Sequence, residues 1–167
     1  MKSQINQASQ AKLESPEDLF KKMLGRAQYL LAMREHGAKE LKTKLCQKFA
    51  EYEQTPGLVD EVIRLCQQKN WQSDERYVES YVRMATQKGQ GPLKIRQALM
   101  RASDDQASMD AHLNLGDDVW CEIAQAALEK KYQDAHKPTE RKEHAKRLRF
   151  LQSRGFSGSQ CYKAFKT

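Results

Sequence analysis

The sequence predicts an all-α protein of tandem three-helix repeats, about nine helices in all, that form an elongated and curved array. Apolar residues recur at helical spacing along most of the chain, and no segment alternates apolar with polar residues as a half-buried strand does. Part of the pattern also recurs at a constant offset, which indicates a repeat. Three positions match in this way: Gly37 with Gly91, Leu41 with Ile95, and Leu45 with Leu99. A single irregular helical domain remains the alternative, because the third copy is looser.

The first repeat is assigned to residues 15–72. Residues 1–14 are polar and rich in Gln, Ser and Asn, so we predict a disordered tail before it. The first helix starts at Ser15-Pro16-Glu17-Asp18, where the serine can cap, the proline suits the first position, and the acids favour the positive helix end. We expect this helix to reach about Glu35, before Gly37 breaks it.

Two more helices complete the first repeat. The second carries Leu41 and Leu45 and is expected to end at the turn Thr55-Pro56-Gly57. The third closes near Asn70-Trp71 and has apolar residues at i, i+3, i+4 and i+7, namely Val59, Val62, Ile63 and Cys66.

The second repeat is assigned to residues 73–115. Ser73 or Asp74 caps its first helix, which bears an apolar stripe that includes two tyrosines. Gly91-Pro92 separates this helix from the next, and a short, weakly patterned helix is expected over about Asp104 to Asn114.

The third repeat is assigned to residues 116–167. Its first helix opens at Asp117-Asp118, and His136-Lys137-Pro138 separates this helix from the second. The last helix begins with a capping box, in which Ser157 caps and Gln160 reaches back to the cap residue.

Composition limits the class of protein. The net charge of +7 and pI of about 9.2 favour anionic partners such as nucleic acid, or describe a basic protein with no such partner. The N-terminus has no apolar signal region, and no apolar run is long enough for a membrane helix. We therefore expect a cytoplasmic monomer without contact to membranes. Its four cysteines show no metal-ligand spacing and are expected to be buried free thiols, with no metal and no cofactor.

Charge is segregated along the chain. Residues 21–48 hold eight basic residues against two acids, and residues 130–154 hold nine against three. Between these blocks, residues 102–129 contain no Lys or Arg at all. The two positive blocks could contact a polyanion, or the charges could serve solvation and pairing between repeats.

Helical spacing places some cations on shared outer faces. Lys94 and Arg101 fall on one side of their helix, opposite Ile95 and Leu99, and a second such face lies on the corresponding helix of the third repeat. Arg96 flanks the apolar face and is interpreted first as a structural ion pair. The candidate binding residues are Lys39, Lys42, Lys88, Lys94, Arg96, Arg101, Lys142, Lys146 and Arg149.

Aromatic residues and histidines give a weaker indication of a binding site than the basic residues do. Tyr77, Tyr81 and Trp120 share the apolar faces, so core packing is favoured over base stacking for them. Phe150 lies off the apolar face beside basic residues, which hints at binding or at packing against a neighbouring repeat. His144 is the histidine expected in the core, and no catalytic constellation is readable.

The central segment resembles the RecX family, bacterial regulators of the RecA recombinase. The resemblance is carried by Asp74-Glu75-Arg76-Tyr77, then Gly91-Pro92, then Lys94-Ile95-Arg96 and Leu99, and it extends over roughly residues 20 to 165. The short helix after Arg101 departs from the family pattern, because Ser103-Asp104-Asp105 stands where members more often have a glycine and an apolar residue.

This resemblance implies a function without catalysis. It implies a protein that binds RecA filaments on DNA and modulates, mostly by inhibition, RecA ATP hydrolysis, strand exchange and coprotease activity, and hence DNA repair, recombination and the SOS response. The alternatives are a sequence-independent DNA-binding helical-repeat protein that acts without RecA, and a helical adaptor for another protein.

Overall fold

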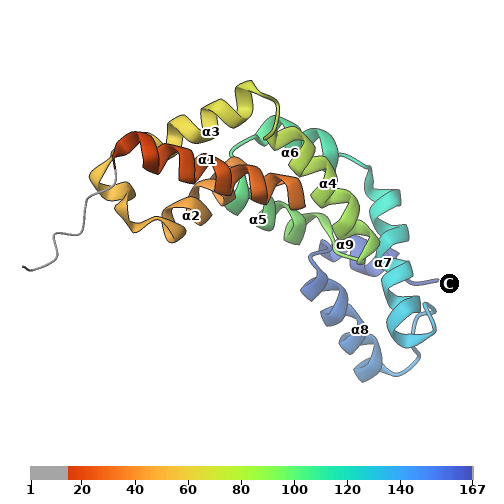
Figure 1. Ribbon diagram of the computed structural model, residues 1–167. Helices are drawn as coiled ribbons and strands as arrows, with labels where there is room; N and C mark the ends of the chain where they lie inside the picture. The colour runs from red at the N-terminus through yellow and green to blue at the C-terminus, as the bar shows by residue number, and fades with distance from the viewer. Residues whose placement is uncertain (1–14, 167) are drawn as a thin grey trace, which may run out of the picture.

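The computed structural model describes residues 15–166, apart from the side chains of Glu51 and Tyr52, so the tail predicted for residues 1–14 lies outside the described residues. Within this part the helices form an elongated, curved array, which confirms the predicted all-α architecture (Figure 1). Residues 15–166 contain no β-strand, and a single bridge joins His136 to Lys166. The helices of this part are α1 (Pro16–Met33), α2 (Ala38–Lys48), the 3-10 helix η1 (Ala50–Gln54), α3 (Leu58–Gln68), α4 (Asp74–Gln87), α5 (Pro92–Ala102), α6 (Gln106–Leu113), α7 (Asp117–Tyr132), α8 (Arg141–Arg154) and α9 (Gly158–Lys163).

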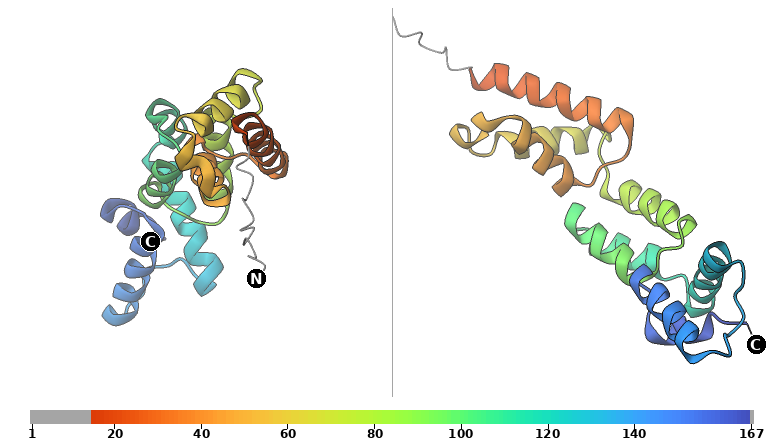
Figure 2. Two further views of the ribbon diagram at one scale, coloured as in Figure 1. Left: turned by 60° about the vertical axis from the view of Figure 1, so that its left-hand side comes forward. Right: turned by 90° about the horizontal axis from the view of Figure 1, so that it is seen from below.

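We group the α-helices by threes, in chain order, as repeats 1, 2 and 3. In each repeat the third helix packs against the first and the second. The repeats follow one another along the long axis of the molecule (Figure 2), and repeat 3 turns away from the direction of the first two (Figure 1). Among the described residues, no helix is both long and apolar enough to cross a lipid bilayer.

Capping residues start the helices where the sequence predicts. Ser15 accepts a hydrogen bond from the Asp18 amide, Ser73 accepts one from Arg76, and both bonds of the predicted Ser157–Gln160 capping box are present. Two ends differ from the prediction. Helix α1 stops at Met33 rather than about Glu35, and α2 stops at Lys48, with η1 in place of its expected last turns.

The start of α6 explains the departure from the family pattern. The Asp105 side chain accepts a hydrogen bond from the Ser108 amide and so caps the helix, which begins at Gln106 rather than at Asp104. Ser103 is fully buried, and its hydroxyl accepts a hydrogen bond from the Asp105 amide. In this chain a polar N-cap therefore stands at the position where RecX-family members more often have a glycine followed by an apolar residue.

The array has two hydrophobic cores rather than three. Repeat 1 encloses a core of its own, whose buried residues are Leu19, Met23, Ala27, Leu30, Leu41, Leu45, Val59, Val62, Ile63 and Cys66. Repeats 2 and 3 share one continuous core that runs from Tyr77 to Ala164. Each fully buried aliphatic or aromatic side chain contributes roughly 1.5–3 kcal/mol, so the shared core couples the stability of repeats 2 and 3.

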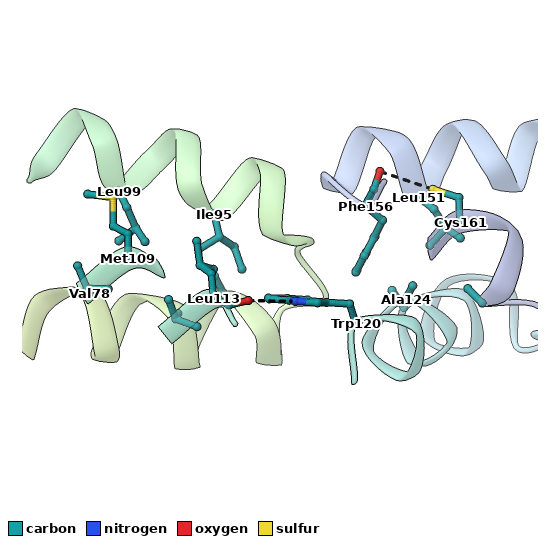
Figure 3. Close-up of a cluster of buried hydrophobic side chains, with 14 of the residues drawn as sticks. Val78, Ile95, Leu99, Met109, Leu113, Trp120, Ala124, Leu151, Phe156 and Cys161 are labelled. Carbon is teal, nitrogen blue, oxygen red and sulfur yellow. Dashed lines mark hydrogen bonds between the residues drawn. The ribbon is translucent and has the colours of Figure 1, made fainter. Parts of the chain in front are cut away.

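Trp120 joins the two halves of the shared core. Its ring lies between the cluster around Ile95 and Leu99 and the cluster around Leu151 and Phe156 (Figure 3). The side chain is 3% exposed, and its indole N–H donates to the Leu113 carbonyl at 3.3 Å. The prediction that Trp120 belongs to the core is confirmed.

Successive repeats meet through the same kind of joint. The glycine before the second helix of one repeat packs against the C-terminal end of the second helix of the next. A Cβ atom on Gly37 would collide with the Ala102 carbonyl, and one on Gly91 would collide with the Gly155 backbone. At the second joint the Gly91 amide also donates to the Arg154 carbonyl at 2.8 Å.

The buried histidine is His36, not His144 as the sequence suggested. His36 is 2% exposed at the corner between α1 and α2, whereas His144 is half-buried against the rings of Tyr162 and Phe165. The pattern missed His36 because it lies in a loop, outside any helical stripe. Its Nδ1 lies 3.0 Å from the Arg34 carbonyl and its Nε2 lies 3.4 Å from Lys44 Nζ, which suits a neutral ring with the proton on Nδ1.

Stability is expected to fall in mild acid because of His36. Burial lowers the pKa of His36 from the ordinary 6.5. The hydrogen bond to the Arg34 carbonyl and the Glu40 charge oppose this effect, whereas the Arg34 and Lys44 charges add to it, and the pKa remains lowered. Below about pH 6.5 the unfolded chain therefore takes up a proton that the folded chain resists, so the free energy of unfolding decreases as the pH falls toward the lowered pKa. Urea titrations at several pH values will measure this slope.

The variant His36→Gln is expected to flatten the dependence between about pH 7 and 5.5. An unchanged slope in His36→Gln would assign the effect to other groups.

The four cysteines are free thiols in this structure, as predicted. Cys66 and Cys161 are buried, and burial raises the pKa of each thiol. The prediction of burial is wrong for Cys46 and Cys121, which are partly exposed. Both lie at the edge of an apolar helical stripe, where periodicity alone does not distinguish core from boundary.

Candidate binding surfaces

Four of the nine candidate cations form ion pairs with carboxylates. Lys39 pairs with Asp104, and the other three pairs join Lys42 to Asp60 at 2.7 Å, Arg96 to Asp110 at 2.7 Å, and Lys146 to Glu143 at 3.3 Å. The structural pair expected for Arg96 is confirmed. Exposed pairs of this kind contribute about 0–1 kcal/mol each, but each carboxylate also reduces the charge that its cation offers to a polyanion.

Two candidate lysines belong to the joints between repeats. Lys39 Nζ donates to the Met100 carbonyl at 3.2 Å, near the end of α5, and Lys94 Nζ donates to the Ser153 carbonyl at 3.3 Å, near the end of α8. Each cation thus caps the negative end of the helix against which its repeat packs. These two side chains have equivalent roles in the first and second joints.

The remaining candidates have no carboxylate partner among the described residues. Lys88, Arg101, Lys142 and Arg149 are all exposed. Arg101 lies with Lys39 and Lys42 around a shallow hollow between α2 and α5, which we call the α2–α5 surface. Lys142, Lys146 and Arg149 lie together along α8, which we call the α8 surface, although Glu140 and Glu143 share it. The structure therefore separates the candidates into patches on successive repeats.

Three acids of the segment 102–129 form ion pairs with basic residues of the same chain. Asp104 pairs with Lys39 across the first joint, Asp110 pairs with Arg96 within repeat 2, and Asp117 lies 3.9 Å from Lys163 within repeat 3. Pairing within and between repeats, the alternative weighed for the charge blocks, thus accounts for these three acids.

A third basic surface was missed by the sequence analysis. Lys88 lies beside Lys130, Lys131 and Arg154 around a groove between repeats 2 and 3, which we call the junction groove. Its residues come from α7, α8 and the end of α4, so no single helical face contains them. Their one signal in the sequence is the start of the basic block at Lys130.

The aromatic residues lie largely as predicted. Tyr77 is buried and Tyr81 packs half-buried against the same core. Burial raises the pKa of Tyr77 to about 12, so its hydroxyl stays protonated. Phe150 is half-buried and lines the junction groove, and its ring packs against Tyr132 of its own repeat rather than of a neighbouring one, with ring centroids 5.7 Å apart.

Family models match two parts of the chain. The model described as the second three-helix domain of RecX matches residues 73–102, and that of the third three-helix domain matches residues 117–165. The regulatory protein RecX of Serratia proteamaculans is 33% identical over 152 residues, which cover 80% of this chain and 90% of that protein. The chain belongs to the RecX family. The Vibrio campbellii regulatory protein RecX is 37% identical over 131 residues, or 78% of this chain and 81% of that protein.

Solved RecX structures share the fold. The crystal structure of RecX from Lactobacillus salivarius has a TM-score of 0.68 and 22% identity, and covers 89% of this chain and 95% of that one. A second crystal structure, of a regulatory protein RecX, has a TM-score of 0.70 and 22% identity, and covers 98% of this chain and 80% of that one. At this identity the likeness concerns the arrangement of helices.

The residues that carry the RecX resemblance mostly build the joints. Asp74 accepts hydrogen bonds from the Ala38 amide at 2.8 Å and from Gln72 at 2.9 Å, which ties repeat 2 to the corner of repeat 1. Arg76 pairs with Glu35 at 2.8 Å across the same joint. Together with Gly91 and Lys94 at the second joint, these residues fix how neighbouring repeats pack.

Proposed function

We propose that this RecX-family chain binds RecA filaments on DNA and modulates RecA ATP hydrolysis, strand exchange and coprotease activity, mostly by inhibition, in DNA repair, recombination and the SOS response. Membership of the RecX family, whose members compared above are named regulatory proteins, carries this proposal. In this proposal the protein is a cytoplasmic monomer and acts by binding rather than by catalysis.

The distribution of charge supports an extended partner. The α2–α5 surface lies in repeats 1 and 2, the junction groove between repeats 2 and 3, and the α8 surface in repeat 3. Basic patches spread along an elongated array suit a long polyanionic filament better than one compact ligand.

The direct experiment titrates the protein into RecA hydrolysing ATP on single-stranded DNA. We expect inhibition at or below one protein per RecA monomer. Unchanged hydrolysis at every ratio would exclude the proposed function.

Charge reversal on the unpaired cations is expected to weaken this inhibition. The variant carries Arg101→Glu, Lys142→Glu and Arg149→Glu, because these exposed side chains have neither a carboxylate partner nor a hydrogen bond across a joint among the described residues. We expect the concentration for half-maximal inhibition to rise about tenfold or more, since each contact to a phosphate or carboxylate becomes a repulsion. Circular dichroism will check that the fold is kept.

The matched control reverses three exposed cations of repeat 1, Lys48, Arg64 and Lys69, and so makes the same change in net charge. An equal loss of RecA inhibition in the two variants would show that net charge alone, and not the α2–α5 and α8 surfaces, governs inhibition.

The second candidate function is sequence-independent DNA binding without RecA. The carboxylate-free lining of the junction groove favours it. It predicts tight DNA binding in the absence of RecA that weakens steeply with salt, together with no effect on ATP hydrolysis by preformed RecA filaments.

A further inference from the structure

The junction groove is a hollow of about 570 Å³ at the joint between repeats 2 and 3. The end of α4 and the following Gly89 form one wall, and α7 and α8 form the others. A Cβ atom on Gly89 would lie 3.0 Å from the Ala127 side chain and 4.0 Å from the Arg154 guanidinium. The groove is therefore formed by close packing of two repeats rather than by one loose loop.

Every charged residue that lines the junction groove is a cation. These are Lys88, Lys130, Lys131 and Arg154, and no carboxylate lies among the lining residues. The three lysines have no carboxylate partner among the described residues, and all three are exposed. The α2–α5 surface differs, because its two lysines are paired with Asp104 and Asp60.

Arg154 has an unused hydrogen-bond donor. One of its terminal nitrogens donates to the Lys88 carbonyl at 3.0 Å, which holds the side chain across the groove. Its Nε is buried and has no hydrogen-bond partner among the described residues. A buried unpaired donor is unfavourable, and the Arg154 side chain that carries it lines the groove.

Helix ends explain part of this charge. Lys88 follows α4 and Lys130 and Lys131 lie in the last turn of α7, where cations are favourable beside the negative helix end. That effect does not explain why the cations of three helices converge on one groove, nor the apolar character of its floor.

The floor of the groove is apolar and partly aromatic. It is formed by Ile123, Ala126, Ala127 and Phe150. Lys131 Nζ lies 4.3 Å from the centre of the Phe150 ring, and the Arg154 guanidinium carbon lies 5.6 Å from it. Lys131 is exposed, so it can leave the ring for a phosphate while a planar group takes its place.

We infer that the junction groove binds a single strand of nucleic acid, with phosphates on Lys88, Lys130, Lys131 and Arg154 and a base against Phe150 and the apolar floor. Cations beside an aromatic platform are how proteins bind single strands without reading their sequence. An acidic peptide would use the cations and leave the floor uncovered. The inference rests on the proposed function in that it names where the protein contacts DNA.

The test measures the anisotropy of labelled oligo(dT) with the full-length protein and without RecA. We expect Lys130→Gln with Lys131→Gln to weaken binding about tenfold and to reduce the slope of log affinity against log salt by roughly 1.4, about 0.7 for each phosphate that is no longer neutralised. The matched control is Lys48→Gln with Lys69→Gln, two exposed lysines of repeat 1, which is expected to keep both affinity and slope.

A second measurement isolates the floor of the groove. Phe150→Leu keeps an apolar side chain but removes the aromatic ring, and it is expected to weaken oligo(dT) binding severalfold with no change in the salt slope. An abasic strand of the same length is expected to bind the unsubstituted protein more weakly than oligo(dT) does. Its affinity for Phe150→Leu is expected to equal its affinity for the unsubstituted protein.

Two results would overturn the inference. One is an equal reduction of affinity in the two lysine pairs, which would make binding a property of net charge. The other is displacement of oligo(dT) by polyglutamate of equal charge as readily as by unlabelled oligo(dT), which would make the groove a site for acidic peptides. The RecA assay is a separate test. If oligo(dT) binding depends on Lys130 and Lys131 but the protein does not inhibit RecA, the junction groove is supported as a DNA-binding site and the proposed function is excluded.

Discussion

Replacing Trp120 with alanine is expected to lower the free energy of unfolding by about 3–5 kcal/mol, the range for removal of a buried aromatic side chain. The indole lies between the two halves of the shared core and is 3% exposed (Figure 3). Its removal leaves a cavity bordered by both repeats and eliminates the donor to the Leu113 carbonyl. Urea denaturation followed by circular dichroism will measure the change.

The chain contains its own control for this substitution. Trp71, the other tryptophan, is 40% exposed at the end of repeat 1, and Trp71→Ala is expected to cost about 1 kcal/mol or less. A decrease below about 1 kcal/mol in Trp120→Ala would show that repeats 2 and 3 do not depend on a common core.

The second large effect is expected at the joint between repeats 2 and 3. Gly91→Ala would place a methyl group against the backbone of Gly155 and Phe156, where no flexible side chain can move aside. The collision also strains the hydrogen bonds from the Gly91 amide to Arg154 at 2.8 Å and from the Leu93 amide to Gly155 at 3.0 Å. We expect the free energy of unfolding to fall by about 2–3 kcal/mol, the upper part of the range of about 1–3 kcal/mol for overpacking of a closely packed site.

Gly25→Ala should change stability in the opposite direction. Gly25 lies within α1, and a Cβ atom there would meet nothing within 4 Å. Alanine is favoured over glycine in helix interiors by about 0.5–1 kcal/mol, so this variant is expected to be slightly more stable.

Small-angle scattering of both variants will show whether Gly91→Ala also changes the shape of the array. A Gly91→Ala variant as stable as Gly25→Ala would contradict the tight joint.

Local structure could be predicted from the sequence because its causes are local. Caps such as Ser73 and the Ser157–Gln160 box need only a few adjacent residues, and they form where predicted. The ends of α1 and α2 were less predictable, because their C-cap residues, Arg34 and Phe49, are not the glycine or asparagine that commonly marks a helix end.

Binding residues were harder to predict because a helical wheel shows only one helix. Lys94 lies on an outward face by spacing, yet its ammonium group reaches α8 of the next repeat. Lys88 of repeat 2 joins Lys130, Lys131 and Arg154 of repeat 3 in the junction groove only because of the way the two repeats pack, and no pattern within one helix encodes that packing.

The motif that identifies the family is also explained by packing. Asp74, Arg76 and Gly91 act in contacts between repeats, so their pattern reveals how the array is assembled. The surfaces proposed to contact the filament lie elsewhere on the molecule.

The division into two cores has a consequence for synthesis on the ribosome. The buried side chains of repeat 1 all lie between Leu19 and Cys66, so this unit can pack once the first part of the chain has emerged. The shared core includes Phe156, Cys161 and Ala164, so it cannot be completed until the chain has emerged as far as Ala164. We therefore expect nascent chains to gain protease resistance in two steps, with repeat 1 protected before repeats 2 and 3.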